Sequence, residues 1–112
     1  MKDKDIIDWL NDATDNAPVC CLGKTPEEFA QAIVGVFMDP KTGHYRAVYA
    51  EDGVLECLLK LNPEWEYQDA VEWYDYNTVR SLPYYDNPPV IIETAPGLML
   101  NRVAKKRKNR KR

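Results

Sequence analysis

Two apolar segments joined by a five-residue turn place the strongest constraint on how this chain folds. Residues 33–38 read Ile-Val-Gly-Val-Phe-Met, and in residues 44–50 Tyr, Ala and Tyr alternate with His, Arg and Val. Between them, Asp39–Gly43 places proline at the second turn position and glycine at the end, the composition of a hairpin loop. We therefore predict a β-hairpin over 33–50, one face of which must be packed.

The remaining apolar residues are spaced to form helices and short strands around this hairpin. Helical spacing predicts a helix over 3–13 and two more over 53–61 and 67–78, which the Pro63 link joins as a helical hairpin. Thr25 and Pro26 predict the start of a further short helix. Strands are expected at 19–22 and 90–93. The pattern indicates an α+β fold, with a small antiparallel sheet of three or four strands packed against a helical hairpin and an N-terminal helix.

Charge divides the chain into two parts. Residues 102–112 hold eight of the 15 basic residues and no acidic residue, so residues 1–101 carry a net charge of about −11 and the remainder +8. We predict a single acidic globular domain over 1–101 and a disordered basic C-terminal tail over 102–112. Phosphate groups attract such a run of cations. The candidate nucleic-acid-binding residues are Lys105, Lys106, Arg107, Lys108, Arg110, Lys111 and Arg112.

The composition limits the class of protein. A chain of 112 residues with 45% hydrophobic residues is expected to form one globular domain. No apolar run approaches the roughly 20 residues that span a bilayer, and the N-terminus lacks the apolar stretch of a secretory signal. The three cysteines, an odd number, fit free buried thiols. We expect a cytoplasmic protein without a membrane partner.

The second half of the chain contains a predicted helix that is rich in aromatic residues and can be compared with helices in other proteins. Residues 69–78 read Asp-Ala-Val-Glu-Trp-Tyr-Asp-Tyr-Asn-Thr and precede the Pro-Val-Ile-Ile segment 89–92. Together with Val34-Gly35-Val36, this resembles a group of small hypothetical proteins encoded by phages and prophages, over roughly residues 17–93. The chain departs from their pattern after Asn77, where 80–85 replaces a glycine-rich segment. The resemblance implies a phage or prophage context and no particular chemistry.

The same region is rich in tryptophan and tyrosine. Because these side chains join a large apolar body to a polar tip, they are frequent at interfaces. We expect Trp73 and Tyr74 to lie in the core, and we expect Tyr84 and Tyr85 to be partly exposed. The candidate partner-binding residues are Trp65, Tyr76, Tyr84 and Tyr85. Asn77 fits a helix C-cap, and Asp69, Glu72 and Asp75 fit a solvated helix face.

Residue types that could support catalysis are few. A catalytic cysteine with His44 as base, or a zinc site from Cys20, Cys21, Cys57 and His44, has suitable groups without the spacing of known motifs. No phosphate-binding, dinucleotide-binding or nucleophile-elbow motif is present. The sequence therefore predicts no catalytic residue, no metal site and no cofactor.

Three functions remain open on the sequence alone. The first is a non-enzymatic phage or prophage accessory protein that binds a macromolecular partner, expected to be a protein. The second is a nucleic-acid-associated protein that uses the basic tail as an electrostatic arm. The third is a small hydrolase or metal enzyme, which would need His44, Cys57 and carboxylates to meet in one cleft.

Overall fold

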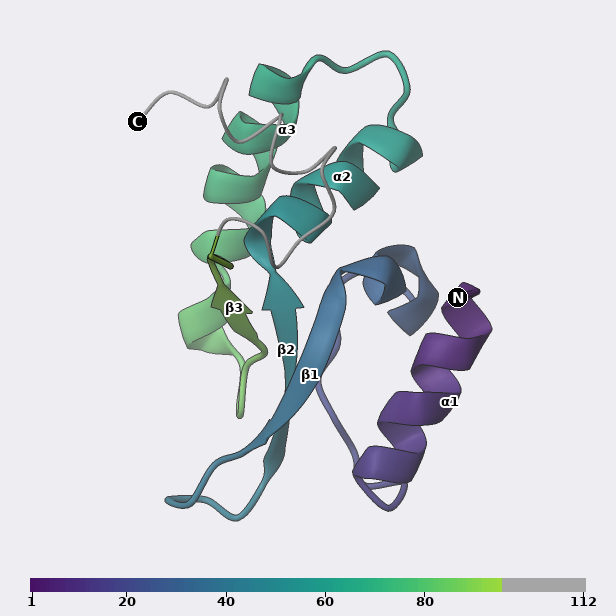
Figure 1. Cartoon of the computed structure of the whole chain (residues 1–112). Helices are drawn as coiled ribbons and strands as arrows, with labels where there is room; N and C mark the ends of the chain where they lie inside the picture. Colours follow the sequence, from purple (N-terminus) through teal and green to yellow (C-terminus); the bar gives the residue numbers. More distant parts are fainter. Residues whose placement is uncertain (96–112) are drawn as a thin grey trace.

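The hairpin forms the centre of the fold. The computed structural model describes residues 1–95, and in it β1 (Ile33–Met38) pairs antiparallel with β2 (Tyr45–Ala50) (Figure 1). Gly43 closes the turn at a φ of 73°, which glycine adopts without a steric penalty. Arg46 Nη2 lies 2.7 Å from Asp39 Oδ2 at the base of the turn, and Asp39 Oδ1 accepts the N–H of Lys41 at 2.9 Å.

The third strand corrects one detail of the expected sheet. The α+β class is confirmed, but β3 (Val90–Ile92) pairs with β2 in parallel, so the three-stranded sheet is mixed and has the order β1-β2-β3. Parallel neighbours need a long crossover. Residues 51–89 supply it, because β2 runs directly into a helix and the chain returns only after the whole helical region.

The helices follow the predicted pattern with shifted ends. α1 (Asp3–Ala13) forms as expected, whereas α2 (Glu51–Leu61) begins two residues earlier than predicted. Ala50 occupies its N-cap position, so Asp52 is inside the helix and is not its cap. Within residues 1–95 no helix is both long and apolar enough to cross a bilayer.

Two helical segments depart from α-helical geometry. η1 (Pro26–Ala32) is a 3₁₀-helix in which Thr25 makes no side-chain capping bond; instead Glu28 Oε1 accepts the N–H of Lys24 at 2.7 Å. The predicted helix over 67–78 is α-helical in α3 (Tyr67–Trp73) and continues as the π-helix η2 (Tyr74–Val79). A short 3₁₀-turn, η3 (Leu82–Tyr84), precedes β3.

One core joins the sheet to the helices. Tyr49, Val54, Leu55 and Tyr74 are its largest fully buried apolar side chains. The cross-strand row Ile33, Tyr49 and Ile91 lies on one face of the sheet and packs into this core. Figure 1 places α2 and α3 at the end of the sheet where β2 finishes, and α1 beside β1.

The strand predicted at 19–22 does not form. The segment is irregular, although Val19 and Leu22 still pack against the core. The backbone N–H of Leu22 donates to the hydroxyl of Tyr49 at 3.0 Å rather than to a neighbouring strand. A run of four apolar residues shows burial but does not by itself establish strand pairing.

Candidate partner-binding surface

α3 and η2 have an inner side that packs against the core and an outer side that carries the candidate surface. Ala70, Tyr74 and Thr78 recur every four residues and are buried against the core. Val71 packs at the edge of the core, whereas two aromatic residues between the buried ones face outward: Trp73 is 39% exposed and Tyr76 is 68% exposed. Trp73 was expected in the core, and the structure corrects that prediction. The inner stripe is already occupied by smaller residues and Tyr74, so the larger indole lies at the boundary.

Trp65, from the link before α3, completes an aromatic group on this surface. Its ring centroid lies 6.3 Å from that of Trp73, with the planes tilted by 44°, within the favourable range for aromatic pairs. We call Trp65, Trp73 and Tyr76 the aromatic face. They line one shallow, open depression of about 570 Å³ together with Asp69, Glu72 and Asn77.

Polar contacts fix the outer end of the aromatic face. The guanidinium carbon of Arg80 lies 4.9 Å from the Tyr76 ring centroid, within cation–π range. Asn77 Nδ2 donates to the carbonyl oxygen of Trp73 at 3.1 Å. Asn77 is inside η2 and does not have a positive φ, so it is not the predicted C-cap. It satisfies a helix carbonyl and holds the turn that carries Trp73.

Two carboxylates, those of Asp69 and Glu72, line the depression beside the aromatic face. Asp69, Glu72 and Asp75 are all exposed, as expected for a solvated helix face. The carboxylate of Asp69 also accepts the N–H of Glu66 at 2.9 Å, which begins α3. The arrangement combines an apolar centre with carboxylates beside it, and the depression is open.

The structure separates the sequence candidates into groups. Trp65 and Tyr76 share the depression, whereas Tyr84 and Tyr85 belong to the η3 region and do not line it. Tyr84 is 89% exposed, and Tyr85 is also exposed, as expected. Trp73 was missed as a surface residue. The four-residue spacing of the buried residues could have indicated this, because it leaves little room in the core for the Trp73 indole. The tail candidates, Lys105–Arg112, lie outside the described residues.

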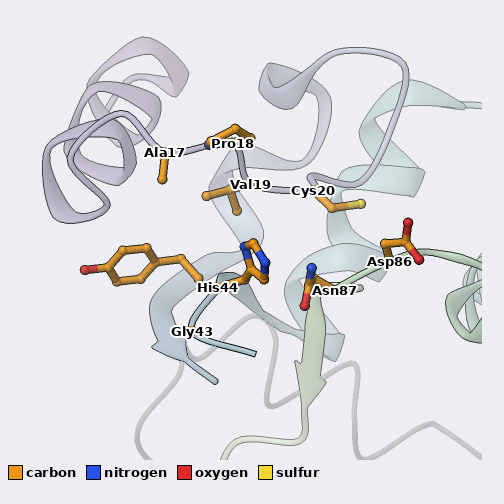
Figure 2. A pocket seen from close by; sticks show the side chains of 9 residues that line it. Ala17, Pro18, Val19, Cys20, Gly43, His44, Asp86 and Asn87 are labelled. Carbon is orange, nitrogen blue, oxygen red and sulfur yellow. The ribbon is translucent and has the colours of Figure 1, made fainter. Parts of the chain in front are cut away.

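A second cavity contains the histidine. It measures about 480 Å³, and Cys20, His44, Asp86 and Asn87 contribute to its lining. Figure 2 shows the His44 ring between Val19 and Asn87, with Cys20 and Asp86 farther along the same side. Burial raises the pKa of the Cys20 thiol, whereas a nucleophilic thiol needs a lowered pKa. Within residues 1–95, Cys20 makes no hydrogen bond to His44 that would activate the thiol.

Cys57 lies away from His44, so the groups that a hydrolase or metal enzyme would need do not meet in one cleft. It is buried on α2 and lines a different cavity from His44, near Asp3 and Lys60. Burial raises the pKa of the Cys57 thiol to about 11. Across residues 1–95, no three His, Cys, Asp or Glu side chains are grouped to hold a metal ion.

Comparison with known proteins identifies no relative of this chain. No protein-family model matches the sequence, and neither the curated proteins nor the solved structures contain a significant match.

Proposed function

We propose that this chain is a non-enzymatic phage or prophage accessory protein that binds a macromolecular partner, a protein, through its aromatic face. One observation carries the proposal: Trp73 and Tyr76 are exposed on a helix whose inner stripe is buried, and they share a depression with Trp65. Exposed aromatic side chains that gather in one place are typical of binding hot spots.

The energetics favour a partner that covers all three rings. Removing exposed aromatic surface from water contributes roughly 25 cal/mol per Å², and rings already held by neighbours lose little side-chain entropy on binding. The Trp65–Trp73 contact and the Arg80–Tyr76 contact hold the rings in this way. The carboxylates of Asp69 and Glu72 favour a partner with basic groups around an apolar centre.

The phage or prophage context is supported by the sequence resemblance carried by residues 69–78 and 89–92. A binding role is consistent with that context. It also agrees with an open depression in place of an enclosed pocket, because small-molecule sites bury most of their ligand.

The test is capture from a bacterial lysate with the full-length chain and matched variants. Tyr76→Ser removes one ring of the aromatic face, and Tyr84→Ser makes the same change at an exposed residue outside it. We expect a specific protein to be captured by the wild type and by Tyr84→Ser, and to be lost with Tyr76→Ser. If Tyr76→Ser captures the protein as well as Tyr84→Ser does, the aromatic face is not the binding surface.

A nucleic-acid role for the tail is a second proposal, favoured by the eight basic residues of 102–112. DNA binding by the full chain should then weaken with salt, with a log–log slope of up to about −7 if all eight cations contact phosphates. A chain ending at residue 101 should not bind. Equal affinity of the shortened chain would rule out the tail.

A further inference from the structure

The outer edge of β1 is open to another strand within the described residues 1–95. The sheet order β1-β2-β3 gives β1 one strand neighbour there. Alternate backbone N–H and C=O groups of such a strand point away from its neighbour. Proteins commonly block this kind of edge with charges, with proline or with a covering helix. Residues 33–38 contain no charge and no proline, and although α1 lies beside the edge (Figure 1), no strand of residues 1–95 other than β2 pairs with β1. The edge therefore keeps its capacity for backbone hydrogen bonding.

A groove lies at the Ile33 end of this edge. It measures about 370 Å³ and lies between Ile33 and Val34 of β1 and Ile6 and Trp9 of α1. Val34 is 48% exposed and Trp9 is 44% exposed. The strand register shifts between Ile33 and Gly35, so Val34 has no cross-strand partner. Bulges of this kind re-aim side chains, and here Val34 contributes to the groove.

The far wall of the groove is held in place. Gln31 Nε2 donates to the carbonyl oxygen of Met1 and to Asp3 Oδ1, both at 2.8 Å. These bonds tie the first turn of α1 to η1, from which β1 continues. In Figure 1, α1 lies alongside β1. Because a helix stands opposite the strand edge, the groove suits a single extended segment better than the edge of a second folded copy.

The charge of α1 defines the chemistry of that segment. Asp5 and Asp12 lie four residues before and three residues after Trp9, so they share its helix face. Both are exposed. Asp5, whose carboxylate also accepts the backbone N–H of Lys2 at 3.2 Å, and Asp12 therefore flank Trp9 on the helix. Their negative charges attract cationic groups at the ends of an apolar ligand.

We propose that the groove between β1 and α1 binds an extended peptide segment of a partner protein, with apolar residues at alternate positions and basic residues at its ends. The segment adds as a strand to the free edge of β1. Its apolar side chains contact Trp9 and Val34, and its basic ends lie beside Asp5 and Asp12. This site is separate from the aromatic face, so each can fail without the other.

Fluorescence anisotropy with the full-length chain tests the site. The probe is a labelled peptide, Lys-Val-Thr-Val-Thr-Val-Lys. One control peptide carries Glu in place of Lys, and another carries Pro in place of Thr, which removes backbone donors. We expect the probe to bind, binding to weaken with salt, and both controls to bind at least about tenfold more weakly. Equal binding of either control overturns the proposal.

Matched variants locate the binding. Val34→Lys adds a repelling charge in the groove, and Ile92→Lys adds the same charge at an exposed position of β3, on the opposite edge of the sheet. We expect about a tenfold loss of probe affinity with Val34→Lys, and no loss with Ile92→Lys or Tyr76→Ser. Retained affinity in Val34→Lys overturns the proposal.

Amide chemical shifts of the wild-type chain provide a readout that needs no variant. The probe should shift the backbone amides of residues 33–37 and the indole N–H of Trp9. Shifts confined to other elements, or no saturable binding, overturn the site. Sedimentation that shows a dimer broken by Val34→Lys would also overturn it, because the groove would then belong to a second copy.

Discussion

At the scale of single residues, Tyr49 connects two parts of the chain that have no secondary-structure pairing with each other. Its ring is fully buried in the core, and its hydroxyl accepts the N–H of Leu22 at 3.0 Å. Tyr49→Phe keeps the ring and leaves this buried N–H without its acceptor. We expect the free energy of unfolding to fall by about 1–3 kcal/mol, measured by urea denaturation.

The control for Tyr49 is the same change at Tyr84, which is almost fully exposed. Tyr84→Phe should leave the free energy of unfolding within about 0.5 kcal/mol of the wild type. Equal stability of Tyr49→Phe and Tyr84→Phe would show that the bond from the Leu22 N–H to Tyr49 contributes nothing to the free energy of unfolding.

Cys57 makes a prediction about alkaline pH. Burial raises the pKa of its thiol from 9.0 to about 11. Between these values the unfolded chain releases a proton that the folded chain retains, so the free energy of unfolding must fall as pH rises through this window. Burial also raises the pKa of Cys20, Cys21 and Tyr49, which adds to the same trend.

The variant Cys57→Ala measures how much of this fall in the free energy of unfolding comes from the Cys57 thiol. Its free energy of unfolding will be lower at neutral pH because a buried group is truncated, but its decline from pH 9 to pH 11 should be shallower than in the wild type. Denaturation curves at several pH values measure both effects. Parallel declines in the two chains would mean that Cys57 titrates normally in the folded protein.

At the scale of elements, the contact between α2 and η1 depends on the absence of a side chain at Gly53. A Cβ there would lie 3.0 Å from both Cα and Cβ of Ala32. Alanine is favoured over glycine in helices by roughly 0.5–1 kcal/mol, but overpacking costs about 1–3 kcal/mol. Gly53→Ala should therefore lower the free energy of unfolding.

Gly35→Ala is the matched comparison, because a Cβ at Gly35 meets no atom within 4 Å. That change should be neutral or stabilising, since glycine weakens a strand interior. Urea denaturation of both variants checks the contrast. A more stable Gly53→Ala would show that η1 moves away from α2 at little cost.

Local patterns predicted elements better than they predicted pairing. The hairpin and α1 are specified by periodicity and turn residues within a few positions, and both form as expected. The direction of β3 depends on the crossover through 51–89, which no local pattern reports. The 19–22 segment is apolar because it packs on the core, and that burial resembles a strand in the sequence.

The candidate surface was only partly visible for a similar reason. Aromatic composition pointed to Trp65 and Tyr76, but the helical pattern placed Trp73 in the core. The helix changes from α to π geometry at Tyr74, and i→i+5 bonding widens the turn. Trp73 and Tyr76 are three residues apart and share a helix face, but Trp65 precedes the helix. A helical wheel drawn through 67–78 leaves Trp65 out and does not give the grouping of all three rings.

At the scale of the whole molecule, the opposed charges of the two parts of the chain predict how stability depends on salt. Residues 1–101 carry a net charge of about −11, which the eight basic residues of 102–112 reduce to −3. Self-repulsion of a charged globule destabilises it, and salt screens that repulsion. A chain ending at residue 101 should therefore gain more stability than the full chain when sodium chloride rises from about 0.01 M to about 0.5 M.

Urea denaturation of both chains across this range of salt measures the difference. A version with the basic residues of 102–112 replaced by glutamine is the control, because it keeps the length and removes the charge. It should behave like the shortened chain. If the shortened chain does not fold at any salt concentration, the segment after residue 101 belongs to the fold, and the division into an acidic domain and a separate basic tail is wrong.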